Sequence, residues 1–197
     1  MIDRSDDIAR RASDNRFRRG REALAIELRR LLGESIPHEP VAEADTAATL
    51  AADARAGHRA AEEHEWALVR RTWPTDDRQA VVALVHALDG ALGSRPVWLV
   101  VPDREPQVVA LTSDVVLDNP LGFAALAALA GGTLGSVELV LHDREVPAGL
   151  WLGRHVHVFG PHDVRYTWEL EIWGAEPWLS AATRALREFG RTEPPAS

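Results

Sequence analysis

The chain has 197 residues, of which 46% are hydrophobic and 26% are charged, a composition typical of a globular protein that excludes a wholly disordered chain. The formal net charge is -8, which disfavours a general nucleic-acid-binding protein and favours partners of positive charge. Cysteine and lysine are absent, so disulfides, thiolate ligands, Schiff bases and P-loop lysine chemistry are excluded.

The N-terminal segment MIDRSDDIARR is charged and lacks the apolar core of a signal peptide. No apolar run in the sequence reaches the roughly 18 residues that a membrane span requires. We therefore expect a cytoplasmic protein. The basic side chains are all arginine and alanine is abundant, which together indicate a GC-rich bacterial genome.

Residues 1–73 are predicted to form a helical arm. A helix is predicted from Asp3 to Leu32, with Ser5 as its cap and leucines at helical spacing in its second half. Its arginine-rich first half carries few apolar residues and is expected to fray or to contact a partner. Residues 33–42 contain two prolines and form a linker. A second, alanine-rich helix follows from Glu43 to Trp73, and we expect the arm to be dispensable for folding of the rest.

Residues 74–190 are predicted to form an α+β domain, and residues 191–197 a disordered tail. The domain is predicted from apolar runs that alternate with turn-forming residues. Its predicted elements are a helix from Thr75 to Leu92, strands over 97–101 and 107–112, a short edge strand over 114–118, a helix over 120–130, a strand over 137–141, a long hairpin over 149–174 and a helix over 176–190.

The segment LGSRPVWLVVPDREP at residues 92–106 resembles LGSVELVLHDREVP at residues 134–147. Each has Leu-Gly-Ser after a predicted helix, then an apolar strand, then Asp-Arg-Glu in a turn. The similarity predicts a duplicated αββ unit, over residues 76–112 and 120–153, although short apolar strands also resemble one another by coincidence. The predicted fold is an α+β fold: a helical hairpin, then the duplicated unit forming a largely antiparallel sheet with helices on one face and a closing C-terminal helix.

The longest predicted hairpin, residues 149–174, contains turn-forming residues at 160–163 between two β-rich runs. A four-residue loop over these positions sets the register of the two strands. The pairs are then Phe159 with Val164, His157 with Tyr166, His155 with Trp168, Arg154 with Glu169 and Trp151 with Ile172. In this register one face is aromatic and aliphatic with two histidines, and the other face is mostly charged.

His155 and His157 share one face of a strand, and His162 follows in the turn. Histidines at this spacing suit first-row metals, so these three residues are the candidate metal site. The spacing resembles the first half of a cupin metal motif, but the acidic ligand and the second motif are missing, so the chain is not assigned to that family. The alternative is that the strand histidines pack beside Tyr166 and Trp168 and stay neutral at pH 7.

Tryptophan is enriched, with 7 in the chain, and several lie in the hairpin and at the start of the last helix. Large aromatic side chains at this density form either a core or an interaction hot spot. The candidate interaction residues are Trp151, Arg154, Glu169, Glu171, Trp173 and Trp178. An exposed Trp173 beside carboxylates would suit a cationic protein partner, unless the last helix covers it.

The two Asp-Arg-Glu turns are a further candidate site, because carboxylates beside an arginine can do acid–base chemistry. The residues are Asp103, Arg104 and Glu105 in one turn and Asp143, Arg144 and Glu145 in the other. A solvated turn is the alternative that we favour, because aspartate is common in turns.

No nucleophile elbow, Walker loop, dinucleotide-binding glycine pattern or HExxH motif is present. We therefore hypothesise a non-enzymatic protein-interaction module without a cofactor, such as an inhibitor, a toxin-neutralising immunity protein, a chaperone or an assembly adaptor. Its expected partner is another protein, of positive charge, or a second copy bound through the helical arm. The alternative is an enzyme that uses a divalent transition metal at His155, His157 and His162. Membranes and nucleic acids are not expected partners.

Overall fold

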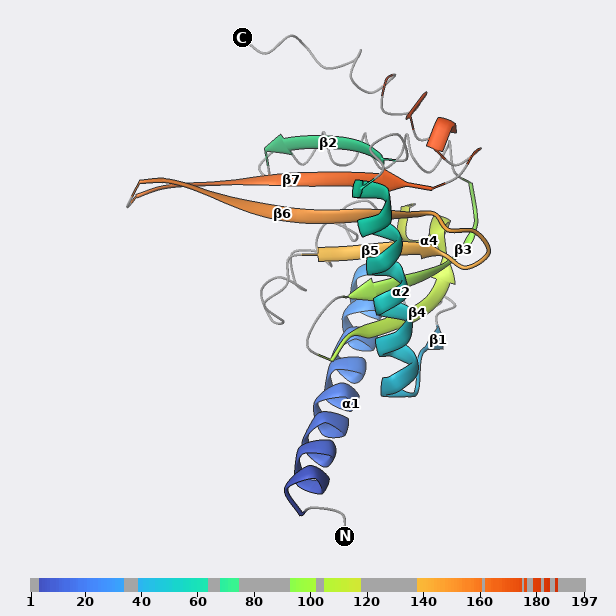
Figure 1. Cartoon of the computed structure of the whole chain (residues 1–197), viewed down its shortest axis with the longest axis vertical. Helices are drawn as coiled ribbons and strands as arrows, with labels where there is room; N and C mark the ends of the chain where they lie inside the picture. The colour runs from blue at the N-terminus through green and yellow to red at the C-terminus, as the bar shows by residue number, and fades with distance from the viewer. Residues whose placement is uncertain are drawn as a thin grey trace.

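The computed structural model describes residues 4–33, 39–63, 68–74, 93–101, 105–117, 138–160, 162–174 and single positions between 176 and 187 (Figure 1). Its elements are α1 (Arg4–Leu32), β1 (Glu39–Pro40), α2 (Ala44–Glu63), β2 (Leu68–Pro74), β3 (Pro96–Val101), β4 (Gln107–Thr112), α4 (Ser113–Leu117), β5 (Glu138–Asp143), β6 (Gly149–Gly160) and β7 (Asp163–Trp173). Within the predicted C-terminal helix, Glu176 lies in a turn, and the other described residues, at positions 179–181, 183, 184 and 187, are helical.

The described strands form one 7-stranded sheet in the order β1-β4-β3-β5-β6-β7-β2. Every pair of neighbouring strands is antiparallel. β3 and β5 lie side by side at the centre, and each is joined to its own hairpin partner, β4 and β6. The predicted α+β class with an antiparallel sheet is confirmed.

The predicted helix from Glu43 to Trp73 is wrong at its C-terminal end. α2 ends at Glu63, and the segment LVRRTWP forms β2, which pairs with β7 from Leu68 opposite Trp173 onward. Leucine, valine, threonine and tryptophan suit a pleated surface, and this pairing outweighs the helical preference of the alanine-rich segment before it.

Two shorter elements also differ from the prediction. The linker over 33–42 contains β1, which pairs with β4 at the edge of the sheet, where a proline is tolerated. The predicted edge strand over 114–118 is wrong, because residues 113–117 form the short helix α4. The hydroxyl of Ser113 accepts a hydrogen bond from the Arg95 N–H at 3.0 Å, and such side-chain to backbone bonds compete with strand pairing.

α1 and α2 cover one face of the sheet, and α2 runs across the strands in Figure 1. The helices and the sheet share one cluster of buried side chains. Its members are Phe17, Ala47, Ala51, Ala54 and Ala61 from the helices and Val100, Val108, Val140, Trp151 and Trp173 from the strands. The predicted helical arm over residues 1–73 therefore belongs to the same core as the sheet.

The middle of α1 is fixed to the turn before β4. Phe17 is buried, and its carbonyl accepts a hydrogen bond from the Gln107 side chain at 3.3 Å. Arg16 forms an ion pair with Glu105 at 2.6 Å, and the Ser13 hydroxyl donates to the same carboxylate at 3.1 Å. These contacts contradict the expectation that the first half of α1 frays.

The opposite face of the sheet buries a second set of aliphatic side chains. They are Val97, Leu99, Val101, Val109, Leu111, Leu141, Leu150, Leu152, Leu170 and Ile172. Alternation along each strand separates this set from the residues that face α2. The sheet is therefore apolar on both faces.

Leu99 provides a direct test of this second set. It is fully buried on β3 and lies opposite the buried Leu141 of β5. We expect Leu99→Ala to lower the free energy of unfolding by about 2–5 kcal/mol, because the removed side chain leaves a cavity at the sheet centre. Denaturant unfolding measures this loss. Val158→Ala, at an exposed position, is the control and should change stability by less than about 0.5 kcal/mol.

Both predicted repeat units contain their strand pair. β3 with β4 and β5 with β6 are hairpins that meet at the centre of the sheet. The helices predicted over 75–92 and 120–130 lie outside the described residues. The internal duplication therefore stays a prediction.

Candidate functional site

The β6–β7 hairpin has a different register from the predicted one. Gly160 pairs with Asp163, so that two residues join the strands, and Val158 pairs with Val164. Phe159 is then the extra residue of a β-bulge. The predicted register with its four-residue loop is wrong, and the shift of one residue exchanges which side chains of β6 and β7 share a face.

The candidate metal residues are placed by this register. His155 lies opposite Thr167 and His157 lies opposite Arg165, while His162 is exposed in the turn. The predicted pairing of these histidines with aromatic residues is therefore wrong. Among the side chains that the structure describes, no group of three histidines or carboxylates could hold a metal ion. The side chains of His155 and His157 are outside that set, so the metal site stays a prediction.

Three of the candidate interaction residues come together beneath α2. Trp151 on β6 lies opposite Glu171 on β7, and Trp173 is in the next alternate position of β7. All three are buried, and Glu171 and Trp173 are each only 2% exposed. They therefore form part of the core, and the prediction of an exposed tryptophan beside carboxylates is wrong for Trp173.

The remaining candidate interaction residues lie elsewhere. Glu169 is half-buried opposite Gly153, on the same side of the ladder as Glu171. Arg154 lies opposite Trp168, so the positions of Arg154 and Glu169 are on opposite faces of the ladder. Trp178 is outside the described residues.

This register changes the expected energetics of the Arg154 and Glu169 positions. The predicted cross-strand pair would have coupled them by a few tenths of a kcal/mol up to about 1 kcal/mol. In the observed register they occupy opposite faces of the ladder, so we expect a coupling energy of about zero. A double-mutant cycle with Arg154→Ala and Glu169→Ala in denaturant unfolding measures it. A coupling above about 0.5 kcal/mol would indicate the slipped register instead.

A buried polar cluster surrounds His58 of α2. The His58 Nε2 atom contacts the Glu171 carboxylate. The imidazole stacks on Trp151 with ring centroids 5.6 Å apart and lies 5.0 Å from Trp173. The carboxylate is taken out of water by the fold, and the histidine supplies its polar partner there. Sequence reasoning missed His58, although it lies at helical spacing on the stripe of small residues from Ala47 to Ala61.

Glycines make room for the two indoles. A Cβ atom at Gly149 would collide with the ring of Trp173, and one at Gly153 would collide with the ring of Trp151. On the helix above, a Cβ at Gly57 would lie 3.3 Å from Trp173 Nε1. The absence of side chains at these positions lets α2 approach the aromatic row closely.

His142 of β5 extends this cluster. It lies opposite Gly149 in the ladder, and its Nδ1 atom is buried without a hydrogen-bond partner among the described residues, as is Trp173 Nε1. Burial lowers the pKa of His142, and the charges of Asp143 and Asp53 oppose that shift. The cluster therefore contains groups that can titrate, but α2 covers them.

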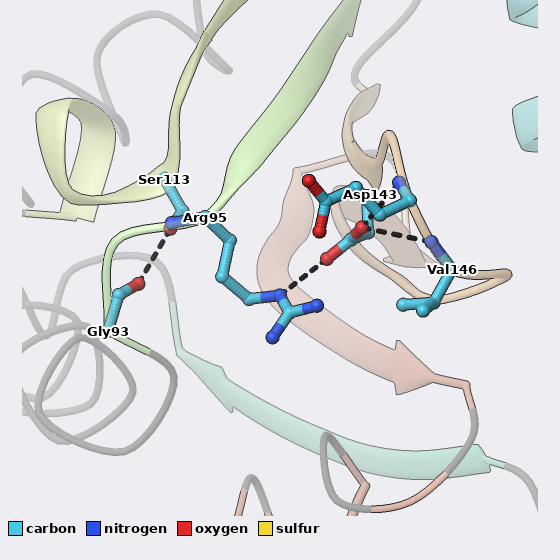
Figure 2. Close-up of polar contacts among 6 residues, drawn as sticks. Gly93, Arg95, Ser113, Asp143 and Val146 are labelled. Carbon is cyan, nitrogen blue, oxygen red and sulfur yellow. Dashed lines mark hydrogen bonds and ion pairs between the residues drawn. The ribbon is translucent and has the colours of Figure 1, made fainter.

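The second Asp-Arg-Glu turn is held together by its aspartate (Figure 2). Figure 2 shows the Asp143 carboxylate directed toward Arg95 and toward the backbone of its own turn. Arg95 Nε donates to it at 2.5 Å, and the N–H groups of Glu145 and Val146 donate at 2.8 and 3.1 Å. The Asp143 side chain is fully buried, so its role here is to fix the turn.

The other members of the two turns have structural contacts as well. The Arg144 guanidinium lies 4.4 Å from the centroid of the Trp98 ring, a cation–π contact. Glu105 binds Arg16 of α1. Asp103 and Arg104 lie outside the described residues. The described contacts favour the turn interpretation over acid–base chemistry.

An exposed apolar group lies at the tip of the β6–β7 hairpin. Figure 1 shows this hairpin reaching beyond the ends of β2 and β5. Val158 is 70% exposed, Phe159 67% and Val164 44%. Side chains of this kind are usually buried, and three on one tip form a candidate contact surface for another macromolecule.

No protein-family model, no curated protein and no solved structure matches this chain. Among the described residues, no helix is long and apolar enough to cross a membrane.

Proposed function

We propose that this chain is a non-enzymatic protein-interaction module of a bacterial cytoplasm, which binds its partner through the tip of the β6–β7 hairpin. The exposed apolar tip, made of Val158, Phe159 and Val164, is the observation that carries the proposal. Apolar and aromatic side chains on a projecting element are the usual anchors of protein–protein interfaces.

The apolar tip lies on the same face of the hairpin as a buried pair of leucines. Leu152 lies opposite Leu170, and both are buried, while Val158 lies opposite Val164 further along the same two strands. The two pairs are separated by an even number of residues, so they share one face of the ladder. A partner that covers the tip would extend the core packing outward by the same kind of contact.

The chemistry of the partner follows from charge. The chain has 22 arginines against 30 carboxylates, giving a net charge of -8, and Asp163 at the tip is exposed. A negative protein attracts positive proteins over long range and accelerates their association. The partner is therefore a protein of net positive charge with an apolar pocket for the tip, as expected for an inhibitor, an immunity protein or an adaptor.

Affinity capture with matched variants tests the proposal. Phe159→Ser removes the bulged apolar side chain, and Ile26→Ser removes a comparably exposed one, at 61%, from α1. We expect one cationic protein to be captured by the unchanged chain and by Ile26→Ser but lost with Phe159→Ser, and its association to slow at higher salt. Capture that survives Phe159→Ser would contradict the proposal.

The same purified protein also tests the two alternatives, a metal-dependent enzyme and a homo-oligomer. Elemental analysis that finds stoichiometric zinc, iron or manganese, lost in His157→Leu, would favour the metal-dependent enzyme at His155, His157 and His162. Self-association that is lost in Ile26→Ser would favour a homo-oligomer through α1. Either result would replace the hairpin tip as the functional site.

A further inference from the structure

The contact between α2 and the sheet is made mostly by very small side chains. The helix presents Ala47, Ala51, Ala54 and Ala61 to the core, with Gly57 between them, and the half-buried Leu50 packs against the same cluster. Burial stabilises in proportion to the apolar area removed from water, and alanine and glycine offer little of it. The attachment of α2 therefore depends strongly on its one large described side chain in the aromatic row, His58.

His58 binds through its ring and its polar edge together. The ring stacks on Trp151, and Nε2 contacts the Glu171 carboxylate, which is 2% exposed. Release of the helix would expose both indoles and give the carboxylate back to water. The contact thus fixes α2 by a small number of specific interactions.

His142 lies under the same helix, on β5, one strand away from Trp151 and two strands away from Trp173. A Cβ at Gly57 would lie 3.8 Å from His142 Cε1, so no side chain of α2 separates the helix backbone from this imidazole. The Nδ1 atom of His142 has no hydrogen-bond partner among the described residues, and neither has Trp173 Nε1 beside it. A proton on His142 would place a positive charge on a half-buried ring beneath α2, where Nδ1 lacks an acceptor among the described residues, although the Ala148 backbone favours the charged form.

We propose that α2 is an acid-sensitive cover: protonation of the half-buried His142 favours transient opening of α2 from the Trp151–Trp173 row while the central sheet stays folded. This inference does not depend on the proposed function of the hairpin tip.

The charged groups around His142 influence how readily its imidazole is protonated. α2 contributes Asp53 and His58, and β7 contributes Glu171. β5 and its following turn contribute Asp143, which is paired with Arg95, and Arg144. The described positions of β6 nearest to His142 are uncharged. Burial is the largest influence and lowers the pKa of His142, whereas Asp143, Asp53 and a hydrogen bond to the Ala148 backbone favour the protonated form. The Arg144 guanidinium adds a positive charge 4.4 Å from the ring of Trp98, which lies opposite His142 in the ladder.

The direction of the pH effect follows from the lowered pKa. Above the pKa of an exposed histidine, about 6.5, His142 is neutral in both states and α2 stays docked. As the pH falls through this value toward the lower pKa of the docked state, the released state binds the proton more readily. The equilibrium for opening then rises by up to about tenfold for each unit by which burial lowers the pKa.

Hydrogen–deuterium exchange of the full chain, corrected for intrinsic rates, tests the cover at about pH 7.5 and about pH 5.5. We expect the protection of α2 amides to fall at the lower pH, by up to about tenfold, while β3, β5 and β6 keep theirs. His142→Phe keeps an aromatic ring without a titrating group, and α2 should then stay protected at both pH values. His162→Phe, in the exposed turn, is the matched control and should respond like the unchanged chain.

Three outcomes would overturn the proposal. α2 protection that is equal at both pH values excludes an acid-sensitive cover. Simultaneous loss of protection in α2 and in the central strands means global unfolding instead of release. A response that persists in a folded His142→Phe variant assigns it to another group, and if that variant does not fold, NMR titration of His142 in the unchanged chain decides whether its protonation coincides with α2 opening.

Discussion

A chain that begins at Thr75 is expected to lose its cooperative thermal transition. The truncation removes α1, α2 and both edge strands, and it leaves Val100, Val140, Trp151 and Trp173 exposed on the face that they covered. Full burial of each large apolar side chain contributes about 1.5–3 kcal/mol, and a domain has only about 5–15 kcal/mol of net stability. Calorimetry or circular dichroism on heating measures the transition.

The control is a shorter truncation. A chain that begins at Ala12 removes only the first turns of α1 and keeps Ser13, Arg16 and Phe17, which hold that helix to the turn before β4. We expect this chain to melt cooperatively. If the chain that begins at Thr75 also melts cooperatively, α1 and α2 are separable from the sheet and do not share its core.

The strands at the centre of the sheet were accessible from the sequence. β3 and β4 begin and end within one residue of their predicted bounds, because apolar runs are separated there by a turn rich in proline and charge. β2 was missed because its pairing partner, β7, lies about a hundred residues away. Local propensity over Leu68–Pro74 does not carry that information.

The register of the β6–β7 hairpin could not be predicted from the sequence pattern. The turn-forming residues from Gly160 to Asp163 are compatible with a loop of two or of four residues. The choice depends on whether Phe159 forms a bulge, which backbone hydrogen bonding decides. Since side chains alternate along a strand, this single residue reassigned the partners of both candidate metal histidines.

The buried cluster was hidden for a different reason. His58 and Glu171 are 113 positions apart in the chain and meet only when α2 docks on the sheet. The sequence held one local signal, a lone histidine on a stripe of alanines. That signal identifies His58 as one partner of the contact but does not identify Glu171 as the other. The acidic residue itself was selected from the sequence, but as part of an exposed surface.

Replacement of Glu171 is expected to have the largest effect of any single substitution considered for this chain. Glu171→Ala should lower the free energy of unfolding by about 3–5 kcal/mol, because it leaves the His58 edge without its acceptor and opens a void between two indoles. Glu171→Gln keeps the volume and an acceptor oxygen, so its smaller loss isolates the contribution of charge. Denaturant unfolding at neutral pH measures both.

The cause of that loss is tested by a double-mutant cycle with His58→Ala. Residues in direct contact typically couple by about 0.5–3 kcal/mol, and the burial of Glu171 places this pair toward the upper end. Glu145→Ala removes an exposed carboxylate and should change stability by less than about 0.5 kcal/mol. A loss at Glu171 that is no larger than this control, or that is independent of His58, would mean that the contact does not hold α2 on the sheet. The attachment would then depend on the alanine stripe and Leu50.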